Sequence, residues 1–122
     1  MQRTRLIAIA VGLLVAGCQP TGNPACAETS VFLEATVGDT GMDPSALTVC
    51  RDQDVSLDLA SETDGVFHIH GYDEQVPATS LEPGEVTTLE FTADRAGQFI
   101  IELHAQSGGD STDIGVLTVN EP

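Results

Sequence analysis

Basic residues are scarce in this chain of 122 residues. It contains no lysine, and its four arginines stand against 19 aspartates and glutamates, which gives a formal net charge of −15. Two arginines precede Cys18 and every acidic residue follows it, so two arginines against 19 carboxylates leave a charge of −17 on residues 19–122. Such a surface repels a phosphate backbone, which argues against nucleic acid as a partner. It would attract cations or a basic protein, although a well-solvated surface explains the same charge.

Long apolar runs are absent except at the N-terminus. There Arg3 and Arg5 precede the run "LIAIAVGLLVAG", which is shorter than an ordinary membrane span. This pattern predicts that residues 1–17 are a signal peptide for export. The end of the run, "LVAGC" (14–18), resembles the lipobox of bacterial lipoproteins, in which a cysteine after a small residue is lipidated. The resemblance implies that Cys18 carries acyl chains that hold the mature protein to a membrane.

The residues that follow suggest where the protein is anchored. Gln19 comes directly after Cys18, and bacterial sorting rules then favour the outer membrane in a Gram-negative host, facing the periplasm. We therefore expect the protein at the bacterial cell envelope. Residues 18–28 contain proline and glycine and are predicted to be a lipid-anchored tether, which leaves residues 29–122 as one domain of common size.

Cysteine is also rare, because only Cys26 and Cys50 remain once Cys18 is assigned to lipid. In an exported chain a disulfide between them is the default expectation. The alternative is a metal site with two thiolates, and no histidine lies near either cysteine in the sequence.

Sustained apolar repeats of helical period are absent, so we expect little helix. Short runs rich in β-branched and aromatic residues, several of them alternating apolar with polar residues, recur between turn-like segments. These seven runs are residues 30–37, 47–50, 55–61, 66–72, 86–93, 98–105 and 115–120. Their number and spacing predict an all-β domain, either a β-sandwich or a small barrel.

Three stretches resemble the cupredoxin family. Residues 43–61 resemble its second and third strands, "FHIHGYD" (67–73) resembles the stretch that supplies its first histidine ligand, and residues 81–104 followed by "IGVLTV" (114–119) resemble its last hairpin. The resemblance implies a cupredoxin-like Greek-key β-sandwich of about seven to eight strands. The motifs H-x-H-G-Y-D and E-L-H are similar to those of a bacterial lipoprotein subgroup.

The chain departs from the family at the metal site. A blue copper centre uses a cysteine thiolate near the end of the penultimate strand, and usually a methionine in the next loop. Here the cysteine position falls on or next to Leu103, and no cysteine or methionine occurs after Cys50. A blue centre is therefore excluded, and electron transfer that depends on the thiolate is not expected.

The chain could still form a metal site from imidazole ligands. His68, His70 and His104 are the three histidines, and the resemblance places all of them where the fold builds its metal centre. Three imidazoles suit Cu(II) or Zn(II), with copper favoured by affinity order. Glu102 lies two residues before His104 and is a further candidate ligand or orienting group. In a flat strand, bases at i and i+2 are roughly 7 Å apart, so His68 and His70 must lean together to share an ion.

Three function classes follow from this. The first is a copper-binding lipoprotein that binds, stores or delivers Cu(II), with a copper donor or acceptor protein as partner. The second is a metal-free cupredoxin-like interaction module of an envelope assembly. The third is a copper oxidoreductase with histidine ligands, which the sequence supports least because it shows no recognisable catalytic motif. Asp73 and Tyr72 are weaker candidates for the metal site, since a turn or core role explains them equally well.

Overall fold

The structure is a computed structural model that describes residue 17 and residues 22–122. The predicted lipid-bearing Cys18 and nearly all of the predicted signal peptide lie outside the described residues. Among the residues described, no helix combines the length and apolar character needed to cross a membrane.

Nine strands and one short 3-10 helix make up the described part of the chain. They are η1 (Pro24–Cys26), β1 (Ser30–Val37), β2 (Met42–Asp43), β3 (Ala46–Cys50), β4 (Asp54–Ser61), β5 (Gly65–Ile69), β6 (Thr79–Leu81), β7 (Val86–Thr92), β8 (Gly97–His104) and β9 (Ser111–Asn120). The seven predicted runs all contain a strand. Two further strands, β2 and β6, are two and three residues long, too short for an alternating pattern to reveal them.

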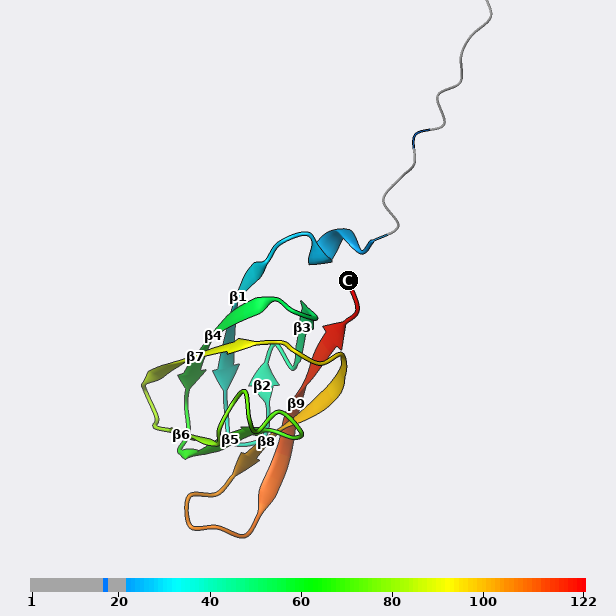
Figure 1. The fold of residues 1–122 in the computed structure, drawn as a ribbon. Coiled ribbons are helices and arrows are strands. Elements are labelled where there is room, and N and C mark those ends of the chain that lie inside the picture. Colours follow the sequence, from blue (N-terminus) through cyan, green and yellow to red (C-terminus); the bar gives the residue numbers. More distant parts are fainter. Residues whose placement is uncertain (1–16, 18–21) are drawn as a thin grey trace, which may run out of the picture.

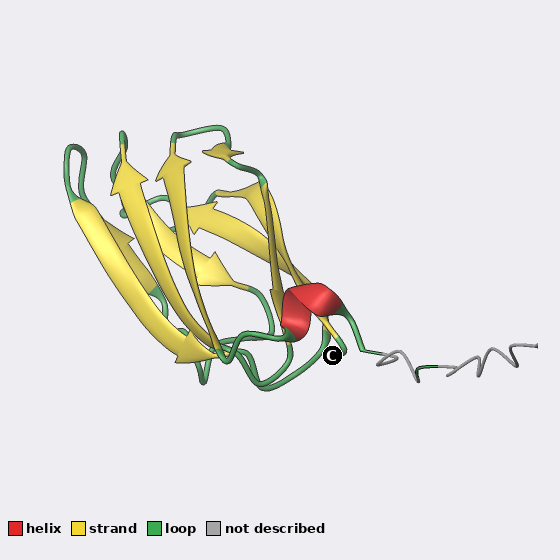
Figure 2. Ribbon diagram, turned by 90° about the horizontal axis from the view of Figure 1, so that it is seen from above, coloured by secondary structure: helices red, strands yellow, loops and turns green. Residues whose placement is uncertain are grey.

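The strands form two sheets that face each other (Figures 1 and 2). One sheet has the order β2-β1-β4-β7, and the other has the order β3-β9-β8-β5-β6. β1 pairs with β4 and β3 pairs with β9 in parallel, while the other neighbours are antiparallel. The prediction of an all-β sandwich is therefore confirmed.

The core lies between the two sheets and decides which side chains reach solvent. In β5, Phe67 and Ile69 are fully buried, and in β8, Ile101 and Leu103 are buried opposite them. Because side chains alternate between the faces of a strand, the residues between these apolar positions lie on the outer face of the five-stranded sheet.

A disulfide joins the start of the described chain to the sandwich. Cys26 in η1 is bonded to Cys50 at the end of β3, with 5.4 Å between their Cα atoms. Next to it, the Gln53 side chain donates to the Glu28 carbonyl at 2.9 Å and accepts from the Cys50 N–H at 2.7 Å. These bonds attach the end of the predicted tether to the turn between β3 and β4.

Candidate metal centre

The register of β5 and β8 brings the candidate residues together. His68 pairs with Glu102, and Val66, two residues before His68, pairs with His104. Residues directly opposite each other in antiparallel strands have Cβ atoms about 5 Å apart. The centre is therefore built on the outer face of the five-stranded sheet.

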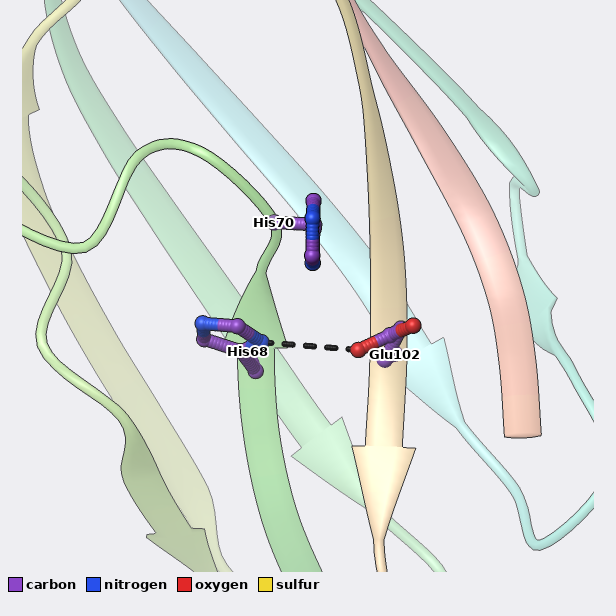
Figure 3. A group of neighbouring side chains, drawn as sticks. All are labelled: His68, His70 and Glu102. Atoms are coloured by element: carbon purple, nitrogen blue, oxygen red, sulfur yellow. Dashed lines mark ion pairs between the residues drawn. The ribbon is translucent and has the colours of Figure 1, made fainter. Parts of the chain in front are cut away.

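His68, His70 and Glu102 form the tightest group (Figure 3). Each offers one ligand atom, and these atoms all lie within 4.8 Å of one another. β5 ends at Ile69, but the His70 N–H still donates to the Ile100 carbonyl at 2.8 Å, so the ladder continues past the strand. The rings of His68 and His70 have centroids 5.9 Å apart, closer than the bases of a flat strand, so the two imidazoles lean together as a shared ion would require.

His104 lies beside this group, at the end of β8. Its ring centroid is 5.6 Å from that of His68. Glu102 stands between the two rings, with its Oε2 3.1 Å from His104 Nε2 and 3.5 Å from His68 Nδ1. The three histidines singled out from the sequence are thus neighbours in space, and Glu102 contacts two of them.

The residues of the centre differ in exposure. The side chains of His68 and Glu102 are 19% and 20% exposed, that of His104 is 40% exposed, and His70 is exposed. A hollow of about 520 Å³ lies on the opposite sheet, beside Phe32 and Phe91, and belongs to another surface. The candidate centre is therefore a shallow, half-covered site that an ion could reach from solvent.

Carboxylates set the electrostatics of the centre. The hydrogen bond with Asp73 raises the pKa of His68 above its ordinary value of 6.5, although burial acts to lower it. The same hydrogen bond lowers the pKa of Asp73. Burial acts to raise the pKa of Glu102, but its hydrogen bond with His104 and the nearby ring of His68 oppose this, and the net shift is downward. Glu102 and Asp73 are thus held as anions beside the imidazoles.

One nitrogen at the centre lacks a partner. Within the described part of the protein, His68 Nδ1 is buried and is the one buried side-chain N or O atom that makes no hydrogen bond. Glu102 Oε2 lies 3.5 Å away but without the geometry of a hydrogen bond. Leaving a buried polar atom unsatisfied is costly, so such atoms often mark a missing ion or ligand. The nitrogen and oxygen donors here fit Cu(II) or Zn(II).

Asp73 contributes more to the centre than the sequence pattern indicated. Its carboxylate Oδ1 contacts His68 Nε2 directly, from the loop between β5 and β6. Gly71, with a φ of 82°, turns the chain there so that Asp73 comes back toward His68. A glycine followed closely by an aspartate after the second histidine is the signal that could have indicated this contact.

Leu103 occupies the position that the resemblance gives to the blue-copper cysteine. Its side chain is 7% exposed and faces the core. A Cβ added to Gly65 would lie 2.7 Å from Leu103 Cδ1, so the leucine fills the space that the glycine leaves open. An apolar side chain therefore takes up this position.

Comparisons with known proteins identify the fold. No protein-family model matches the sequence, and no curated protein matches it. Among solved structures, the chain is similar to a blue copper oxidase from Nitrosomonas europaea (18% identity, TM-score 0.60) over 75% of this chain and 39% of the oxidase. It thus spans about two fifths of that protein.

Two smaller proteins are matched over most of their length. Reduced auracyanin from Roseiflexus castenholzii matches with 21% identity and a TM-score of 0.53, over 75% of this chain and 97% of auracyanin. A copper-binding protein solved by NMR in the apo form matches with 15% identity and a TM-score of 0.60, over 76% and 90%. The domain is therefore a cupredoxin-like β-sandwich, as predicted.

Proposed function

We propose that this protein is an envelope-anchored lipoprotein whose cupredoxin-like domain binds copper as Cu(II) at a non-blue centre. His68, His70 and Glu102 would hold the ion, and His104 would complete the donor set. The protein would bind, store or deliver copper, and would exchange it with a donor or acceptor protein in the envelope.

One observation carries the proposal. Three potential ligand atoms lie within 4.8 Å of one another, and the group includes His68, whose Nδ1 is buried without a hydrogen-bond partner among the described residues. Imidazole and carboxylate donors suit Cu(II) better than Cu(I), which prefers sulfur ligands. The similar structures include a blue copper oxidase and a copper-binding protein, which supports copper over zinc.

The anchoring rests on the sequence. "LVAGC" (14–18) is similar to a lipobox, and the apolar run before it is typical of a signal peptide. Lipid on Cys18 and an outer-membrane location facing the periplasm are parts of the proposal. Mass spectrometry of the mature protein would test them, because a lipidated Cys18 would be the first residue and would carry the mass of its acyl chains.

A Cu(II) titration of the purified full chain tests the centre, by calorimetry and by electron paramagnetic resonance. We expect one ion per chain, with nitrogen hyperfine splitting and no blue absorption band. Outer partners of a metal site typically contribute ten- to hundredfold in affinity, so His68→Ala and His70→Ala should cost more than about hundredfold. Glu102→Gln and His104→Ala should each weaken binding as well.

A matched control is Glu90→Gln, which removes the same charge from an exposed position of β7 in the other sheet. It should bind copper like the wild type. If the wild type binds no copper, or if the histidine variants bind as tightly as Glu90→Gln, the copper proposal fails.

The second candidate is a metal-free interaction module. A specific observation favours it: His68 and His104 already have carboxylate partners, Asp73 and Glu102, so hydrogen bonds within the protein stabilise part of the cluster. Absence of metal binding in the titration would support this candidate.

A further inference from the structure

We propose that Asp73 is a positioning residue: it holds the proton of His68 on Nε2 and turns Nδ1 toward Glu102. Its role in metal binding rests on the proposed copper function, whereas its effect on the His68 ring does not.

The first step is the chemistry of the contact. Asp73 Oδ1 lies against His68 Nε2, and an ionised carboxylate can only accept a hydrogen bond. Nε2 must therefore be the donor. In a neutral imidazole the other nitrogen then carries a lone pair and no proton, which makes Nδ1 the free ligand atom of His68.

The second step is where that lone pair points. Nδ1 is buried, makes no hydrogen bond within the described structure, and lies 3.5 Å from Glu102 Oε2. Two acceptors facing each other without a proton between them repel. A cation between them would be bound by both and would remove this repulsion. Asp73 on the opposite ring nitrogen would then complete the carboxylate–histidine–metal arrangement common in proteins.

The third step is the rigidity of the loop that carries Asp73. Tyr72, its neighbour, is fully buried and packs edge-on against Phe99 with ring centroids 4.6 Å apart. The Tyr72 hydroxyl donates to the Arg95 carbonyl at 2.9 Å and accepts from the Arg95 N–H at 3.0 Å. The Val76 N–H donates to the Tyr72 carbonyl at 2.8 Å.

The loop is therefore anchored in the core on one side of Asp73, and the carboxylate is held at His68 before any ion arrives. Holding a ligand in its binding orientation lowers the entropy lost on binding. Asp73 would thus raise metal affinity without contacting the ion.

The test measures the tautomer and the affinity separately. In the metal-free full chain at about pH 9, where imidazoles are neutral, ¹⁵N chemical shifts identify the protonated nitrogen of each ring. We expect His68 to be protonated on Nε2 in the wild type and to become a mixture of tautomers in Asp73→Ala. Asp73→Asn can still accept through its amide oxygen and should keep the wild-type tautomer.

Calorimetry with Cu(II) supplies the second readout. Asp73→Ala should weaken binding ten- to hundredfold, in the range typical of residues that orient a ligand. Glu74→Gln is the matched control, because it removes the same charge from the next residue of the same loop. It should change the affinity less than threefold.

Each outcome decides the proposal. An unchanged tautomer in Asp73→Ala overturns the positioning role, and equal losses in Asp73→Ala and Glu74→Gln reduce it to an effect of net charge. If the wild type binds no copper, the proposed function fails, but the tautomer of His68 still decides whether Asp73 orients the ring.

Discussion

Glu102 is the residue around which the candidate centre is arranged. It pairs with His68 across the strands, and its Oε2 lies 3.1 Å from His104 Nε2. Its pKa is lowered by these imidazoles despite its burial, so it remains an anion at neutral pH. A carboxylate that is anionic and largely covered strengthens any cation site beside it, because its charge is less screened than one in open water.

Protons should compete with copper at a higher pH than for an ordinary histidine. The pKa of His68 is raised by Asp73, so below that pKa an ion must displace a proton from the ring. We predict that the apparent Cu(II) affinity begins to fall while the pH is still above 6.5, by up to about tenfold per pH unit for this one proton. Calorimetric titrations between about pH 5 and pH 9 measure this.

The variant Asp73→Asn provides the comparison. Without the carboxylate charge, the pKa of His68 should fall toward its ordinary value and the loss of affinity should begin at lower pH. An unchanged pH profile of copper affinity in this variant would contradict the assignment.

The raised pKa of His68 also makes the stability of the metal-free protein depend on pH. While Asp73 is ionised, its contact with protonated His68 stabilises the fold. The histidine's part of this stabilisation is complete below about pH 6.5 and is lost as the pH rises through the raised pKa of His68.

Part of this centre could be predicted from sequence. The alternation of "FHIHG" was enough to put His68 and His70 on one face, and the spacing of Glu102 and His104 put them on one face too. The cross-strand pairing of His68 with Glu102 depends on register, which no local pattern fixes, so the closeness of these two residues emerges only from the structure. The Asp73 contact depends on a loop conformation, and Gly71 shortly before Asp73 is its only sign in the sequence.

At the scale of elements, most strands could be predicted because their apolar alternation is strong. β1 matches the predicted range 30–37, whereas β5 ends at Ile69 although the run was expected to continue to Tyr72. The pattern misled there because Tyr72 is buried as part of a loop that folds into the core, and Gly71 breaks the extended conformation. In the sequence pattern, an apolar residue that follows a strand is therefore mistaken for a continuation of that strand.

The disulfide between η1 and β3 should make a measurable contribution to stability. It links residues 24 positions apart, and a loop of that length corresponds to about 3 kcal/mol in the chain-entropy model. We predict that Cys26→Ala together with Cys50→Ala lowers the free energy of unfolding by about this amount. Urea unfolding followed by circular dichroism measures it.

Copper affinity provides the internal control for that variant. Cys50 pairs with Asn120 at one end of β9, while Glu102 pairs with Asp113 near the other end. The double variant should therefore bind copper like the wild type while it unfolds at lower urea. A loss of affinity equal to that of a histidine variant would show that the disulfide shapes the centre as well.

For the whole molecule, the two outer faces have different chemistry. The five-stranded sheet carries the histidine cluster on its outer face. The outer face of the four-stranded sheet carries several carboxylates. Glu34 lies directly opposite Asp58 on the neighbouring strand, and Asp54 lies opposite Thr92. Like charges opposite each other destabilise a sheet, and hydrogen bonds from Thr88 to Asp58 and from Thr92 to Asp54 offset part of this.

The charge of −17 on residues 19–122 should make stability depend on salt. Repulsion among 19 carboxylates with two arginines favours the expanded chain. Raising the ionic strength from about 0.01 M to 0.15 M shortens the Debye length from about 30 Å to about 8 Å, which screens this repulsion. We predict that the urea midpoint of the metal-free protein at pH 7 rises with sodium chloride and rises equally with choline chloride. Choline is the control because its large cation does not fit a specific cation-binding site. A rise with sodium but not with choline would indicate specific cation binding, and a midpoint that falls or stays constant would mean that the folded sheet tolerates its charge without cost.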